Sequence, residues 1–170
     1  GAGSGFTMSG GVTLNGNLTL QTNENVITGS TKASSILTGG VTGTGNLLLN
    51  NLGLAANVIT INSTSVNHSG SITLSGTAAT GDTTISAPIG SNVTSVTQNS
   101  ATSRLVLSGS NAYSGATTIN TGTLALGANN VLPDTTAVSI GAATLNAATF
   151  ADTAGTLDVT GSATINLGSG

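Results

Sequence analysis

Short apolar–polar–apolar triplets recur along the chain, and they limit its fold more than any other feature of the sequence. The triplets occupy residues 12–14, 18–20, 59–61, 72–74, 105–107, 124–126, 138–140, 157–159 and 165–167. Alternation with a period of two residues is typical of β-strands, because successive side chains in a strand point to opposite faces. Gly, Asn or Ser follows almost every triplet within a few residues, so the predicted strands are short and separated by turns. We predict an all-β protein with no substantial helix.

The predicted strands end at closely spaced positions, which indicates an internal repeat. From residue 49 onward the ends fall, at intervals of about a dozen positions, at Leu49, Ile61, Leu74, Ile85, Val96, Leu107 and Ile119. A β-sandwich or an up-and-down barrel would need hairpin turns between such strands, and Asn15-Gly16 is the one strong hairpin signal that we find. We therefore predict a right-handed parallel β-helix with roughly 20 to 25 residues per coil and about seven or eight coils. Residues 1–170 form a single solenoid segment in this interpretation, as part of a longer repetitive chain.

Charged side chains make up only 4% of the chain, where about a quarter is usual. They are Lys32, Arg104, Glu24, Asp82, Asp134, Asp152 and Asp158. Two cations cannot form the basic face of a nucleic-acid binder, and the longest apolar run is far shorter than the ~20 residues of a membrane-spanning helix. We expect no nucleic-acid partner and no membrane insertion by this segment. We also expect exposed ion pairs to be nearly impossible, and stability to be largely indifferent to salt and to pH between about 5 and 9.

Residues 105–127 read LVLSGSNAYSGATTINTGTLALG, and this segment closely resembles the autotransporter-associated β-strand repeat. The positions in register with the common form of that family are Leu105, Leu107, Gly109, Asn111, Tyr113, Gly115, Thr117, Ile119, Gly122, Leu124, Leu126 and Gly127. Ala112 and Ala116 depart from the residues that the family often has there, and both are small. The resemblance implies a right-handed parallel β-helix in the exported part of a bacterial surface protein, and hence an extracellular or cell-surface location.

The residues of this repeat also predict how it packs. Three pairs are expected to face the interior, one on each wall of a coil: Leu105/Leu107, Thr117/Ile119 and Leu124/Leu126. The predicted interior set is Leu105, Leu107, Ile119, Leu124, Leu126, Ile140, Leu157 and Val159. Gly109, Gly115 and Gly122 are expected at corners, where positive φ or close backbone approach favours glycine. We expect Tyr113 to pack its ring over a corner and leave its hydroxyl in water, and Asn and Thr at the corners to stack as hydrogen-bonded ladders.

The sequence carries little of the chemistry that enzymes need. A glycoside hydrolase requires two facing carboxyl groups, and we interpret Asp152 and Asp158 as solvated surface acids instead. His68 is the one histidine and is expected on the surface, and Gly81-Asp82 is an isolated fragment of a calcium-binding repeat. The chain has no cysteine. We expect no enzymatic activity, no catalytic or metal site, and no cofactor.

Two functions remain open on the sequence alone. The first is a structural stalk or fibre segment of a secreted or cell-surface bacterial protein that binds chiefly its own kind. The second is an adhesin passenger segment that binds glycan or protein on a neighbouring surface. The short, small inter-strand segments favour the structural function. Strand-like residues lie near both ends, and we find no cap, so we expect either continuation of the solenoid or head-to-tail stacking of copies.

Overall fold

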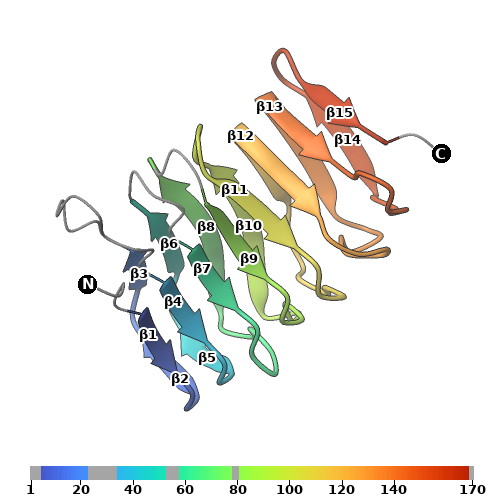
Figure 1. Ribbon diagram of the computed structural model, residues 1–170. Coiled ribbons are helices and arrows are strands. Elements are labelled where there is room, and N and C mark those ends of the chain that lie inside the picture. The colour runs from blue at the N-terminus through green and yellow to red at the C-terminus, as the bar shows by residue number, and fades with distance from the viewer. Residues whose placement is uncertain (1–4, 23–33, 53–57, 78–80, 169–170) are drawn as a thin grey trace, which may run out of the picture.

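A computed structural model describes residues 5–22, 34–52, 58–77 and 81–168 of this chain. All regular elements in these ranges are β-strands, which confirms the predicted all-β class. The described residues contain no helix that is long and apolar enough to cross a membrane. Every strand pairing is parallel. The strands lie side by side in a large, strongly curled sheet of solenoid-like form (Figure 1).

The first wall of the solenoid contains Gly5–Met8 (β1), Ser34–Leu37 (β4), Val58–Ile61 (β7), Asp82–Ile85 (β9), Arg104–Leu107 (β11) and Thr164–Asn166 (β15). Between β11 and β15, the wall continues through the second parts of Thr117–Leu126 (β12) and Ala137–Asn146 (β13). Neighbours on this wall are 29 positions apart where Thr7 lies beside Ile36, and 19 apart where Val106 lies beside Ala125. The lengths of the turns therefore vary more widely than the sequence predicted.

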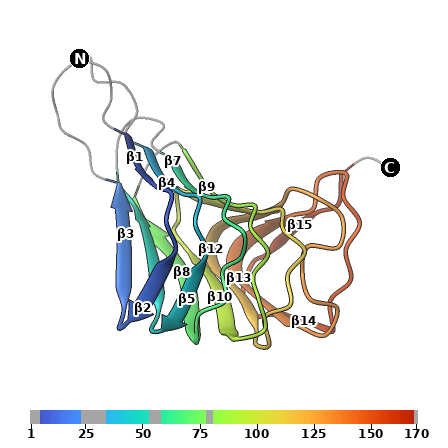
Figure 2. The same ribbon diagram turned by 90° about the horizontal axis from the view of Figure 1, so that it is seen from below.

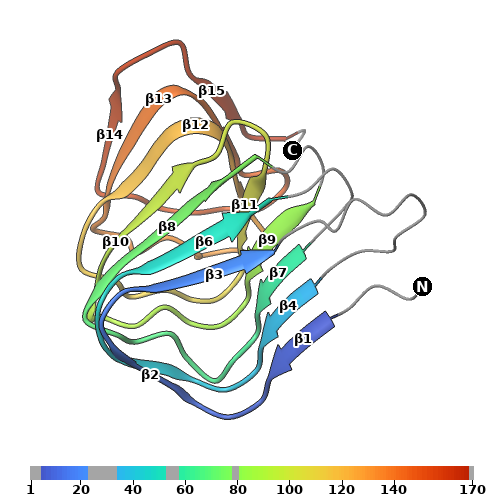
Figure 3. The same ribbon diagram turned by 90° about the vertical axis from the view of Figure 1, so that its left-hand side faces the viewer.

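The second wall contains Leu18–Thr22 (β3), Leu47–Asn51 (β6), Gly70–Gly76 (β8), Val93–Asn99 (β10), the first parts of β12 and β13, and Thr156–Val159 (β14). The third wall is shorter, and consists of Val12–Asn15 (β2), Val41–Thr44 (β5) and the bridges from Val41 to Val66 and from Val66 to Ile89. Figure 3 looks along the solenoid and shows β1, β2 and β3 on three sides of one turn. Figure 2 shows β3 at one end and β14 and β15 at the other.

The regular spacing of strand ends in the sequence reflects an alternation between the first two walls. Leu49, Leu74, Val96 and Ile119 lie on the second wall, and Ile61, Ile85 and Leu107 lie on the first. Each step from one strand end to the next therefore carries the chain from one wall to the other, about half a turn.

Two strands are longer than the sequence predicted, because they pass around a corner without interruption. β12 and β13 each have ten residues. The first part of β12 pairs with β10 and its second part with β11, so one strand joins the second wall to the first. Gly122 allows this bend: its φ is +71°, and a Cβ atom there would overlap the carbonyl oxygen of Ser100 in the preceding turn. Gly109 and Gly115 also lie close to the backbone of the preceding turn, and a Cβ atom at either would overlap a carbonyl oxygen there.

The three apolar pairs of the repeat do not occupy three different walls, so that prediction is wrong. Leu105 lies beside Leu124, and Leu107 lies beside Leu126. Two of the pairs therefore stack on the first wall in successive turns, while Thr117 and Ile119 lie on the second. The reason is that the segment between β11 and β12, on the third side, contains no strand.

Branched apolar side chains fill the interior. Those that are fully buried include Leu37, Leu47, Leu49, Ile59, Ile61, Ile72, Leu74, Ile85, Ile89, Leu105, Leu107 and Ile119. Six members of the predicted interior set are buried: Leu105, Leu107, Ile119, Leu124, Leu126 and Ile140. Leu157 and Val159 are 52% and 51% exposed, although β14 places them beside the buried Val138 and Ile140. They lie in interior rows, but β14 pairs only with β13 among the described strands, and nothing described covers its far side.

Candidate functional site

Asn111, a residue of the recognised repeat, joins three successive turns of the chain. Its side-chain oxygen accepts a hydrogen bond from the backbone N–H of Ile89 at 2.9 Å. Its amide nitrogen donates to the carbonyl oxygen of Val131 at 2.8 Å. The side chain is buried, so these bonds satisfy backbone groups that water cannot reach. The function of Asn111 is therefore to hold the solenoid turns together.

Tyr113 lies inside the protein, and the prediction that its hydroxyl is in water is wrong. The residue is 2% exposed, and its hydroxyl lies 2.5 Å from Oγ1 of Thr117. Thr136 in the following turn extends this cluster, since its hydroxyl donates to the carbonyl oxygen of Gly115 at 2.8 Å. Burial raises the pKa of Tyr113 to about 12. A tyrosine held in this way supports the corner and presents no exposed ring face to a ligand.

Asn side chains at the corners form the predicted ladders. Asn46 donates its backbone N–H to the side-chain oxygen of Asn17 at 2.9 Å, and its own side-chain oxygen accepts the N–H of Ser71 at 2.9 Å. The N–H of Asn92 donates to the side chain of Asn67 at 3.0 Å in the same manner. These bonds connect successive turns without any charge.

His68 is fully buried, so its predicted position on the surface is wrong. Its Nε2 atom lies 3.4 Å from the carbonyl oxygen of Ser71, and its buried Nδ1 atom has no hydrogen-bond partner. Desolvation lowers the pKa of the imidazole. His68 lies on the third side of a turn, between Val66 and Ser69, which both form bridges to neighbouring turns. The sequence around it does not alternate clearly, so it gave no signal that the side chain faces the interior.

The two acids weighed as a catalytic pair, Asp152 and Asp158, lie in different environments. Asp158 is exposed on β14, as predicted. Asp152 is only half-exposed, unlike the solvated acid that we expected, because its carboxylate accepts the backbone N–H groups of Val131 and Leu132 at 2.6 and 3.1 Å. Within the described ranges, no three acidic or histidine side chains are grouped as metal ligands. Asp152 thus supports a loop.

Arg104 and Asp82 form an ion pair on the outer face of the first wall, which contradicts the expectation that exposed ion pairs are nearly impossible. β9 and β11 place the two residues side by side, and the guanidinium contacts both carboxylate oxygens, at 3.0 and 2.5 Å. The hydrogen bond to Asp82 raises the pKa of Arg104. The remaining cation, Lys32, and the acid Glu24 lie outside the described residues.

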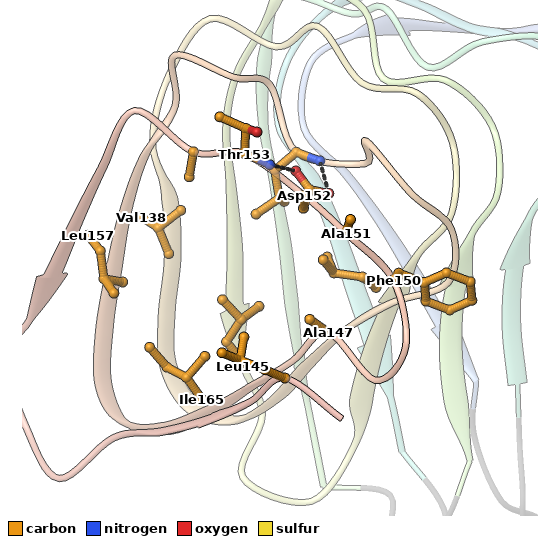
Figure 4. Close-up of a pocket in the computed structure, with 13 residues that line it drawn as sticks. Val138, Leu145, Ala147, Phe150, Ala151, Asp152, Thr153, Leu157 and Ile165 are labelled. Atoms are coloured by element: carbon orange, nitrogen blue, oxygen red, sulfur yellow. Dashed lines mark hydrogen bonds between the residues drawn. The ribbon is translucent and has the colours of Figure 1, made fainter. Parts of the chain in front are cut away.

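The best candidate for a binding site is an apolar recess of about 320 Å³ at the end of the solenoid formed by β13, β14 and β15. We call it the end recess; its lining is Leu126, Leu132, Val138, Leu145, Ala147, Phe150, Ala151, Asp152, Thr153, Ala154, Leu157, Ile165 and Leu167 (Figure 4). Ile165 and Leu167 are 38% and 72% exposed. Sequence reasoning missed this recess because its lining comes from three separate turns.

A second, polar recess of about 810 Å³ lies on the side of the solenoid. We call it the side recess; it is lined by Ser110, Asn111, Ala112, Tyr113, Ser114, Asn130, Leu132, Pro133, Asp134, Thr135 and Thr153. Exposed hydroxyl, amide and carboxylate groups of Ser110, Asn130 and Asp134 could form hydrogen bonds with a polar ligand. Tyr113 contributes no stacking surface, since it is buried.

Comparison with known proteins supports the interpretation of the repeat. Residues 102–126 match the family described as passenger-associated-transport-repeat. This match confirms the resemblance to autotransporter-associated repeats at residues 105–127. No curated protein and no solved structure matches the chain.

Proposed function

We propose, on the premise that residues 102–126 are a passenger-associated transport repeat, that this chain is a structural segment of a secreted or cell-surface bacterial protein. It acts as a stalk or fibre unit in the form of a right-handed parallel β-helix of about seven or eight coils, and it associates end to end with its own kind. The single observation that carries this proposal is that polar side chains of the matched repeat, such as Asn111, bond one turn of parallel strands to the next.

The path of the chain supports the helical part of this proposal. In Figure 3, with β1 nearest the viewer, the chain runs clockwise from β1 through β2 to β3 as it recedes. A clockwise path away from the viewer is right-handed, as connections between parallel strands nearly always are.

The exposed apolar side chains support the association. Large hydrophobic residues that remain exposed are Phe6, Leu157, Val159, Ile165 and Leu167. All five lie in the first described turn or in the last one, and none lies on the described walls between. Exposed apolar groups at an open sheet edge invite further strands, which either a longer stretch of the same chain or another copy can supply.

The described polar groups support a structural rather than an enzymatic function. Asn111, Asp152 and Tyr113 are residue types from which sites are often built. Asn111 and Asp152 each bond one turn to another, and Tyr113 is buried with its hydroxyl against Thr117. We accordingly propose no catalytic activity, and no nucleic-acid or membrane partner for this segment.

The test is the concentration dependence of particle size for residues 1–170, followed by sedimentation and electron microscopy. We expect particles that lengthen with concentration while their width stays constant, since a head-to-tail contact grows along one axis. Particles that remain strictly monomeric at the highest soluble concentration would contradict end-to-end association.

Adhesion is a second candidate function, and the side recess is the observation that favours it. Its exposed Ser, Asn and Asp side chains can form hydrogen bonds with the hydroxyl groups of a glycan. The test is binding of the chain to a panel of surface glycans, with Asn130→Ala as the variant and Asn120→Ala, also exposed but outside the recess, as the control. Binding that Asn130→Ala and Asn120→Ala weaken equally would exclude the recess.

A further inference from the structure

We propose that the side recess binds amino-sugar units of a surface glycan, and that the carboxylate of Asp134 recognises the positively charged amine of the sugar. This inference rests on adhesion, the second function proposed above, and adds the chemical class of the ligand. The lining of the recess comes mainly from residues 110–114 and 130–135, in two successive turns of the solenoid.

Four polar side chains in the side recess are free to bind a ligand. Ser110, Asn130, Asp134 and Thr135 line the recess and are exposed. Among the described residues, no hydrogen bond or ion pair engages these four side chains. An ionised carboxylate only accepts hydrogen bonds, whereas hydroxyl and amide groups both donate and accept them. The free groups therefore match a ligand that carries several hydroxyls and at least one further donor.

The backbone that carries these groups is fixed before any ligand binds. The N–H of Asn130 donates to the carbonyl oxygen of Ala151 in the following turn at 3.0 Å. The N–H of Thr136 donates to the carbonyl oxygen of Pro133 at 2.9 Å, which closes the tight turn that bears Asp134. A preorganised site loses little conformational entropy on binding, so more of the contact energy appears as affinity.

The charge of the side recess favours a cationic ligand. Asp134 contributes one carboxylate, and Asp152 places a second one close by, because it accepts the backbone N–H of Leu132 in the lining. Arg104, the one cation in the described part of the chain, is paired with Asp82 on the first wall. Negative charge without a nearby cation attracts ammonium groups and disfavours anionic sugars such as uronic acids.

A protonated amine could come from a lysine side chain as well as from an amino sugar, and the lining favours the sugar. A lysine carries a long apolar stem that packs on apolar surface, but Tyr113 and Leu132, the large apolar side chains of the lining, are buried. The hydroxyls of an amino sugar surround its amine, where the free hydroxyl and amide groups of the recess can bond to them. The volume of about 810 Å³ lies within the range of ~300 to 1,000 Å³ that is usual for small-ligand sites.

The experiment compares two short oligosaccharides, one of glucosamine and one of N-acetylglucosamine, for binding to residues 1–170 by calorimetry. At about pH 6, where the free amine is protonated, we expect glucosamine units to bind about five-fold more tightly at low salt. This preference should shrink at high salt, as an exposed ion pair does. It should also shrink as the pH rises and the amine loses its proton.

Two variants separate recognition of the amine from general charge. Asp134→Asn keeps the shape of the side chain and should abolish the preference, while binding of the acetylated oligosaccharide stays unchanged. The matched control is Asp158→Asn, which removes the same charge from an exposed acid outside the recess and should keep the preference. If both variants reduced the preference equally, it would come from net charge, and the proposed role of Asp134 would be wrong.

Asn130→Ala separates this inference from the adhesive function itself. We expect it to weaken both oligosaccharides by about three- to ten-fold and to leave the preference intact, because it removes a neutral hydrogen-bonding group. Equal binding of the two oligosaccharides, still weakened by Asn130→Ala, would overturn amine recognition and leave adhesion standing. An oligolysine that bound as tightly as the glucosamine oligosaccharide, and lost its binding in Asp134→Asn, would overturn the assignment to a sugar. If neither oligosaccharide nor any other glycan bound, adhesion and this inference would both be contradicted.

Discussion

The hydroxyl of Tyr113 lies 2.5 Å from Oγ1 of Thr117, inside the solenoid. Burial raises the pKa of Tyr113 from its ordinary value of 10.0 to about 12. The folded state therefore favours the protonated phenol, and the stability that this gives is complete below pH 10 and is lost as the pH rises from 10 through 12. A shift of this size corresponds to a loss on the order of 2 to 3 kcal/mol.

Unfolding in guanidinium chloride at intervals between pH 9 and pH 12 measures this loss. Tyr113→Phe keeps the ring and removes the titrating group, so its stability should fall less over the same interval. At pH 7 the variant should lose about 1 kcal/mol, the usual value of one hydrogen bond. If stability fell equally with pH in the parent chain and in the variant, Tyr113 would not be the cause of the loss.

We predict that the buried His68 lowers the stability of the protein in acid. Burial lowers the pKa of its imidazole below the ordinary 6.5. The unfolded chain then binds a proton more readily than the folded one, so stability is complete above pH 6.5 and declines as the pH falls from there toward the folded pKa. We therefore no longer expect the stability of the protein to be independent of pH at the acidic end of the interval from about pH 5 to pH 9.

The measurement is direct because His68 is the one histidine in the chain. A single imidazole resonance should titrate below 6.5 in the folded protein. His68→Phe, which keeps a ring in the interior, should flatten the dependence of stability on pH between about 7 and 5. An imidazole that titrates at or above 6.5 would contradict the buried position.

Gly115 tests how closely the turns approach one another. A Cβ atom at this position would overlap the carbonyl oxygen of Thr94 in the preceding turn, whereas a Cβ atom at Gly10 would have open space around it. Gly115→Ala should therefore reduce the free energy of unfolding by about 2 kcal/mol or more, because the two backbones must separate. Gly10→Ala should change it by less than about 0.5 kcal/mol. Equal effects in chemical denaturation would show that the turns are more loosely stacked.

The sequence predicted those features of the fold that depend on local alternation. The period of two residues identified Leu105, Leu107 and Ile119 as interior residues, and the spacing of strand ends followed the chain from wall to wall. Both signals arise within a few residues along the chain, which is why they can be read without knowing the neighbouring turns.

Features that depend on the next turn could not be predicted in this way. Leu124 stacks on Leu105 because this turn is short, and no single triplet reveals the length of a turn. Arg104 meets Asp82 for a similar reason, since the turn between them has the length that brings β11 beside β9. The burial of Tyr113 and His68, and the recess at the end, likewise depend on which residues lie above and below.

Asn111 should be the most sensitive polar position in the repeat. Its buried side chain satisfies the N–H of Ile89 and the carbonyl oxygen of Val131, which belong to the turns on either side of its own. Asn111→Ala leaves both groups without partners, and each unsatisfied buried group costs about 1 to 3 kcal/mol. We therefore expect a loss of roughly 2 to 5 kcal/mol in the free energy of unfolding.

Asn120→Ala is the matched control, because Asn120 is exposed and its 3.2 Å bond to Asn99 can be replaced by water. Its loss should stay within about 0.5 kcal/mol. Hydrogen exchange adds a second readout: the amide of Ile89 should exchange faster in Asn111→Ala, while amides of the first turn stay unchanged. If Asn111→Ala were as mild as Asn120→Ala, the bonds between turns at this corner would not contribute to the stability of the solenoid.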